Sequence, residues 1–96
     1  MELSKIKAYI GFARKSRNIK FGVDDILKLK NSVLILVSDE LAKSSYEKLQ
    51  NFANKKGCEI LTIESNSFSK LFDSENIKAV AVLDDNLAIA IKKCYD

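Results

Sequence analysis

The stretch Ser-Val-Leu-Ile-Leu-Val, residues 32–37, decides the fold. It is short, almost entirely apolar and contains β-branched residues, which is typical of a β-strand covered by helices on both faces. Residues 79–83, Ala-Val-Ala-Val-Leu, repeat this pattern near the end of the chain. The two stretches predict strands with neither face in contact with solvent.

Amphipathic helices are predicted between and around these strands. Leu3, Ile6, Ile10 and Ala13 recur at helical spacing, which indicates a first helix with its charged residues off the apolar stripe. A second helix is predicted at residues 23–30. A third begins at a capping box of Ser44 and Glu47 and ends near Gly57. Two more helices follow, one capped by Ser67 and the last capped by Asp84 or Asp85. Shorter strands are predicted at residues 19–21 and 59–63.

The predicted order of elements is α-β-α-β-α-β-α-β-α. Strands separated by helices imply crossover connections and a sheet between two helical layers, with at least part of that sheet parallel. We expect a single domain over residues 1–96, because this length suits one hydrophobic core. The chain also has no proline and no internal repeat, and its three glycines are scattered.

Residues suited to catalysis are scarce. The chain has no histidine, which removes the commonest general base and metal ligand. Asp39 and the pair Asp84 and Asp85 follow predicted strands, where carboxylates can hold magnesium, but helix capping explains them more simply. No glycine-rich phosphate-binding motif occurs. The sequence therefore predicts a protein that is not an enzyme and has no cofactor or metal site.

The remaining composition indicates the cellular compartment. Cys58 and Cys94 lack the spacing of a zinc site or a disulfide framework, so we expect reduced thiols packed in the core. No stretch is long and apolar enough to span a membrane, and the N-terminal residues carry charges where a signal peptide needs an apolar segment. These features predict a soluble cytoplasmic protein.

Positive charge is concentrated in the first third of the chain. Residues 1–30 contain eight Lys or Arg and three acids, a net charge of +5, whereas the rest has a net charge of −2. Four cations gather where the first helix is predicted to end: Arg14, Lys15, Arg17 and Lys20. Such a run is often only a solvated helix C-terminus. Here a glycine and a helix start follow, where backbone amides can meet a phosphate or a base edge, which favours nucleic-acid binding.

The same region resembles a known family. Residues 10–63, which begin IGFARKSRNIKFGVDDILK and end GCEILTI, resemble the YlxQ-like bacterial branch of the kink-turn-binding ribosomal-protein superfamily, the L-seven-Ae and L-thirty-e type. The resemblance extends from about residue 3 to the end of the sequence. It implies a three-layer α/β/α sandwich with a mixed four-stranded sheet. It also implies binding of RNA kink-turns, which are sharp bends built around sheared G·A pairs.

The resemblance also implies which residues contact RNA. At the start of its second helix the superfamily has G-x-N-E-x-x-K, and this signature is filled here by Gly22, Val23, Asp24, Asp25 and Lys28. Asp25 is expected to accept from guanine N–H groups and Lys28 to donate to guanine O6 or N7. Asp24 stands where the superfamily has asparagine and can accept hydrogen bonds without donating them.

A second RNA contact in the superfamily is the loop before the short fourth helix. Ile63, Glu64 and Ser65 occupy it here. The sequence thus predicts a non-catalytic protein that binds structured RNA, kink-turn-like and ribosome-associated or part of another ribonucleoprotein, with no membrane or small-molecule partner. The alternative is a protein-interaction module on the same fold without specific RNA recognition, motivated by Asp24, Glu64 and the acidic remainder of the chain.

Overall fold

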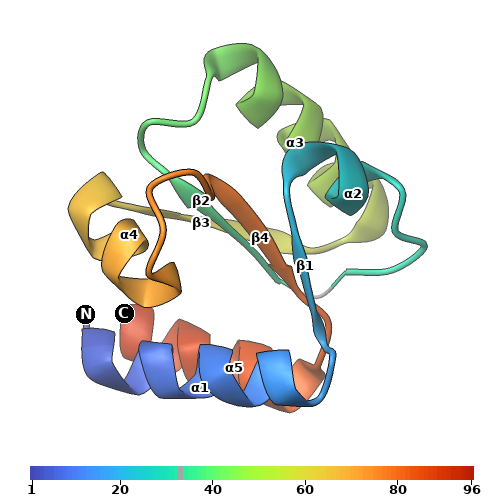
Figure 1. Ribbon diagram of the computed structural model, residues 1–96. Helices are drawn as coiled ribbons and strands as arrows, with labels where there is room; N and C mark the ends of the chain where they lie inside the picture. Colours follow the sequence, from blue (N-terminus) through green and yellow to red (C-terminus); the bar gives the residue numbers. More distant parts are fainter. Residues whose placement is uncertain (33) are drawn as a thin grey trace.

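The computed structural model describes residues 1–32 and 34–96, which form three layers with a sheet in the middle (Figure 1). In chain order the elements are α1 (Leu3–Lys15), β1 (Ile19–Phe21), α2 (Val23–Leu27), β2 (Leu34–Ser38), α3 (Lys43–Lys56), β3 (Glu59–Ile63), α4 (Ser65–Phe72), β4 (Ala79–Val82) and α5 (Asp85–Tyr95). This order agrees with the order that the sequence predicts. Residue 33, part of the predicted second strand, lies outside the described residues.

The sheet is mixed, and its strands lie in the order β1-β4-β2-β3. Strands β2 and β3 are parallel, whereas β4 runs antiparallel to both of its neighbours. Helices α1, α4 and α5 cover one face, and α2 and α3 cover the other (Figure 1). The prediction of a three-layer α/β/α sandwich with a mixed four-stranded sheet is therefore confirmed.

Alternation along the central strands divides the core in two. Leu34 and Leu36 of β2 pack against α1, α4 and α5, whereas Ile35 and Val37 pack against α2 and α3. The residues of β4 alternate in the same way. Because side chains on successive residues point to opposite faces, a strand buried on both faces must be apolar throughout. This requirement explains the continuous apolar runs in the sequence.

Two predicted helix starts are wrong. Helix α3 begins at Lys43 and has Ala42 at its N-cap without a side-chain hydrogen bond, so Ser44 lies inside the first turn and forms no capping box. Helix α4 begins at Ser65, two residues before the predicted cap at Ser67. Its N-cap is Glu64, whose carboxylate accepts from the Asn66 N–H at 2.7 Å.

Other helix ends agree with the sequence more closely. Asp84 caps α5, since its side chain accepts from the Leu87 N–H at 2.9 Å. Helix α2 was expected to reach Lys30 but ends at Leu27. Its last turn tightens through a bond from the Leu29 N–H to the Ile26 carbonyl at 3.1 Å, which is the shorter i to i+3 pattern that often closes a helix.

The cysteines lie in the core as expected. Cys94 is buried, Cys58 is half-buried, and both are free thiols. Burial raises the pKa of the Cys58 thiol, which keeps it protonated and unreactive at neutral pH. In the described part of the chain, no helix has the length and apolar character needed to cross a membrane.

Replacement of Gly57 by alanine and replacement of Gly11 by alanine should change the free energy of unfolding in opposite directions. Gly57 ends α3 at φ +69°, where an L side chain is strained, so Gly57→Ala should lower the free energy of unfolding by about 1–2 kcal/mol. Gly11 lies inside α1 with open space around its missing side chain, so Gly11→Ala should raise it by up to about 1 kcal/mol. Urea unfolding followed by circular dichroism measures both, and equal shifts would contradict the assigned backbone conformations.

Candidate functional site

Four loop segments lie at the same end of the sheet. The strand register pairs Phe21 with Val80 and Val37 with Ala79, so β1 and β2 end where β4 begins. Strand β3 ends at the same edge, because its last residue pairs with Ser38. The segments that follow β1, β2 and β3 therefore lie close to the segment that precedes β4.

We name the polar residues of these segments the sheet-end surface. Its members are Gly22, Asp24, Asp25, Asp39, Glu40, Glu64, Ser65, Asn66 and Lys78. Gly22, Asp24 and Asp25 are the residues that the sequence singled out at the start of α2, and Glu64 and Ser65 are those of the predicted second loop. The fold thus puts two predicted segments that are 40 residues apart in the chain at the same end of the sheet, after its two outermost strands.

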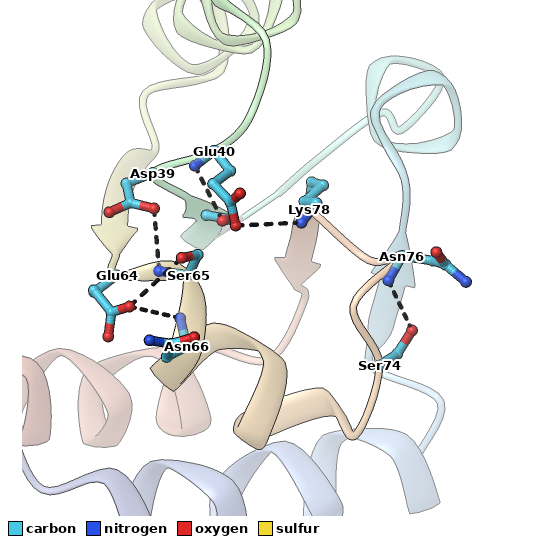
Figure 2. Close-up of polar contacts among 9 residues, drawn as sticks. Asp39, Glu40, Glu64, Ser65, Asn66, Ser74, Asn76 and Lys78 are labelled. Atoms are coloured by element: carbon cyan, nitrogen blue, oxygen red, sulfur yellow. Dashed lines mark hydrogen bonds and ion pairs between the residues drawn. The ribbon is translucent and has the colours of Figure 1, made fainter.

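Hydrogen bonds hold the four segments in place. The Gly22 N–H donates to the Ala79 carbonyl at 3.0 Å, which ties the entrance of α2 to β4. Asp39 links β2 to α4, since its carboxylate accepts from the Ser65 N–H at 3.1 Å (Figure 2). The Asp39 N–H in turn donates to the Ile63 carbonyl at 3.0 Å. Asp39 therefore has a structural role, since it ties the end of β2 to the end of β3 and the start of α4.

A polar hollow of about 380 Å³ lies beside the start of α4. Glu40 and Lys78 form one side of it, with 3.7 Å between the carboxylate oxygen and the ammonium nitrogen (Figure 2). Ser65 and Asn66 line the hollow from α4. No pattern in the sequence indicates Glu40 or Lys78, because they join the site only through pairing of β4 with β2.

Gly22 has the conformation that a ligand-facing glycine needs. Its φ is +91°, it is exposed, and no atom lies within 4 Å of the position of an added Cβ. The positive φ explains why glycine stands here, and the open space leaves the backbone accessible. Helix α2 has only five residues, so its dipole adds little attraction for an anion at Gly22.

The predicted basic cluster does not form one patch. Three residues of β1 separate the end of α1 from Gly22, a distance of roughly 10 Å along the strand. Lys15 and Arg17 stay near the far end of β1, beside the end of β4. Among the four predicted cations, only Arg14 and Lys20 belong to the part of the surface nearer to α2.

Arg14 and Lys20 lie on opposite faces of the sheet. The Arg14 guanidinium carbon is 5.1 Å from the centre of the Phe21 ring, in a cation–π arrangement on the α1 side. Ile19 and Phe21 also pack on that side. Lys20 alternates with them and therefore emerges on the face covered by α2 and α3. The two cations flank the entrance of α2 from either side of β1.

Two predicted contact residues present little or no side chain to a ligand. Ile63 is only 2% exposed and belongs to the core under α1, α4 and α5, so its side chain is not accessible to a ligand. Val23 is half-buried against the core under α2 and α3. Asp24, Asp25 and Lys28 are exposed, as their predicted roles require.

The electrostatic character of the sheet-end surface is acidic. Among its members, the carboxylates come from Asp24, Asp25, Asp39, Glu40 and Glu64 and the one cation is Lys78, whereas Arg14, Lys20 and Lys28 lie beside it. Such a surface accepts hydrogen bonds from base N–H groups and repels phosphates. Among residues 1–32 and 34–96, no three His, Cys, Asp or Glu side chains are grouped so that they could hold a metal ion.

Comparisons with known proteins identify the fold. No family model matches the sequence, and no curated protein matches it significantly. A protein of unknown function from Bacillus halodurans has a similar structure, with a TM-score of 0.81, 13% sequence identity, and coverage of 94% of this chain and 95% of that one. The 15.5kD RNA-binding protein of Giardia lamblia has a TM-score of 0.68 and 18% identity, with coverage of 98% and 85%.

Replacement of Arg17 by glycine should stabilise the protein. Arg17 has φ +60° and follows the C-cap of α1, where the Asn18 N–H donates to the Ala13 carbonyl at 2.8 Å. This left-handed position is normally glycine, so Arg17→Gly should raise the free energy of unfolding by about 1 kcal/mol. The control Lys15→Gly, in the last turn of α1, should lower it. A loss of stability in Arg17→Gly, measured by urea unfolding, would reveal a stabilising contact of the arginine side chain.

Proposed function

We propose that the protein binds a folded RNA without catalysing a reaction, and that the RNA is of the kink-turn type. The observation that carries this proposal is that the segments after β1 and β3, which contain residues 22–28 and 64–66, begin at the same end of the sheet. These are the segments at which the resemblance implies RNA contacts. The likeness of the fold to a protein described as RNA-binding adds support.

Each exposed residue of the α2 segment has a role in the proposal. Asp25 accepts hydrogen bonds from guanine N–H groups, and Lys28 donates to guanine O6 or N7. Gly22 lets the RNA approach the backbone, because a side chain there would occupy the open space. Asp24 excludes phosphates from the same spot, which limits binding to RNAs that present base edges.

The loop before α4 supplies the second contact. Glu64 uses one carboxylate oxygen to cap α4, which leaves its second oxygen to accept from RNA. The Ser65 hydroxyl lies 3.5 Å from that capping oxygen and can also bond a ribose or a base. The proposal extends to a cytoplasmic ribonucleoprotein, of which the ribosome is one form.

A second candidate function is the binding of a basic protein segment. The excess of carboxylates at the sheet-end surface favours it, since opposite charges attract across an interface. Capture of partners from a lysate with and without nuclease treatment separates the two functions. Partners that depend on RNA support RNA binding, whereas partners retained after nuclease treatment support the protein-interaction module.

Lys28→Ala should weaken binding of a kink-turn RNA about tenfold or more, because a lysine that donates to a base edge contributes on the order of 1–3 kcal/mol. The fold should stay intact, since Lys28 is exposed at the end of α2. Fluorescence anisotropy measures the affinity, and circular dichroism checks the helices. The control is Lys93→Ala, which removes an exposed lysine from α5 and should have little effect.

The RNA partner also needs a control. A second RNA with its G·A pairs replaced by Watson–Crick pairs should bind more weakly to the unmodified protein. Equal, weak binding to both RNAs would contradict kink-turn recognition.

A further inference from the structure

A groove of about 420 Å³ runs between the end of α2 and the second half of α3. Leu27, Leu29 and Phe52 give it an apolar lining, and Lys48, Lys55 and Lys56 line it from α3. We name it the α2–α3 groove. No acidic residue lines it. It is therefore a separate surface of opposite charge to the sheet-end surface.

The lysines of the α2–α3 groove have free charges. Among the described residues, none of Lys48, Lys55 and Lys56 has a carboxylate within 4.0 Å. Elsewhere the lysines of α1 and α5 are often paired, for example Lys7 with Asp73 at 3.0 Å. Unpaired cations around one groove create a positive potential that attracts a polyanion.

The spacing of the lysines suits an extended strand. Lys48 and Lys55 are seven residues apart on α3 and therefore lie on the same side, about 10 Å from one another along the axis. A strand that runs along α3 can therefore contact both ammonium groups. Lys56 reaches over the Phe52 ring, with its ammonium nitrogen 5.9 Å from the ring centre. Because Phe52 is only 8% exposed, its ring offers little surface for base stacking.

The α2–α3 groove begins where the α2 segment ends. Helix α2 carries Asp24 and Asp25 in its first turn and Leu27, which lines the groove, at its last residue. Five helical residues span about 7.5 Å, so the two surfaces adjoin. Lys28 follows as the C-cap of α2, between the groove-lining residues Leu27 and Leu29, and Lys20 emerges on the same face of the sheet.

We propose that the α2–α3 groove binds the sugar–phosphate backbone of an RNA strand that leaves the sheet-end surface, an inference that rests on the proposed function. The sheet-end surface repels phosphates and accepts base N–H groups. The adjoining groove has the opposite charge and attracts phosphates. Recognition of bases and binding of the backbone are thus divided between two surfaces that share α2.

The test compares two RNAs and two triple variants of the full chain. One RNA is a kink-turn with short, blunt-ended stems. The extended RNA is the same kink-turn with a ten-nucleotide single strand added at one end or, in a second version, at the other end. The groove variant is Lys48→Gln, Lys55→Gln and Lys56→Gln. The matched control, Lys5→Gln, Lys70→Gln and Lys93→Gln, makes the same charge change at exposed lysines on other helices. Glutamine keeps the helix propensity of lysine, and circular dichroism verifies the fold.

The expected result is specific to the extended RNA. The groove variant should bind it about tenfold more weakly than the control variant does, with a slope of log affinity against log salt that is smaller by about 2. On the minimal kink-turn the two variants should bind alike. Equal affinities and slopes of the two variants on both RNAs would overturn the proposal. Polyglutamate and the free single strand are also tested as competitors of the extended RNA. If polyglutamate competes as strongly as the single strand, and the groove variant loses this competition, the proposal is overturned and the groove is indicated to bind an acidic protein.

Failure of the proposed function gives a different pattern. If Lys28→Ala and replacement of the G·A pairs leave the affinity unchanged while the groove variant still weakens binding of the extended RNA, the sheet-end surface is not the RNA site. The groove then binds RNA independently. If neither RNA binds the unmodified protein at low salt, both proposals are wrong.

Discussion

Burial of β2 and β4 on both faces is the constraint on which the rest of the structure depends. Residues 34–37 and 79–82 are at most 1% exposed, so helices must cover the sheet above and below. Their backbone N–H and C=O groups must also be paired, which β1 and β3 accomplish at the two edges. With both faces of β2 and β4 covered, the polar residues of the segments that enter and leave these two strands lie at the ends of the sheet. The sheet-end surface and its carboxylates are the result at one of these ends.

The sequence predicts most of this architecture, because burial leaves a direct trace in residue type. Continuous apolar runs identify β2 and β4, and helical spacing identifies α1. Strand order is beyond such reasoning, because pairing of β1 with β4 joins residues about 60 apart in the chain. Helix caps are also difficult, since a serine caps a helix only if the chain turns there. At α4 the turn comes earlier, and Glu64 takes the place predicted for Ser67.

Only part of the candidate site could be predicted, because only residues that are close in the sequence form a pattern that can be seen there. Gly22, Asp24, Asp25 and Lys28 are neighbours in sequence and remain neighbours in space. The basic residues before them are nearly continuous in the sequence. In a strand, however, successive side chains point to opposite faces of the sheet, so Lys20 lies on the face opposite to Phe21. Conversely, the lysines of the α2–α3 groove come from residues 31–96, whose overall net charge of −2 did not draw attention to them. Only the packing of α3 against α2 brings them beside the α2 segment.

The two surfaces together explain how a net charge of only +3 suits the proposed function. A protein that binds RNA through charge alone holds any polyanion, because phosphates are the same in every sequence. In the proposed function, the surface assigned to base edges carries carboxylates, which make approach of an ordinary phosphate backbone unfavourable. The proposal assigns the cations beside it to an RNA whose shape puts base N–H groups at the carboxylates and phosphates in the groove. On this proposal a bent RNA meets both requirements at once, whereas a straight duplex places its phosphates against the carboxylates.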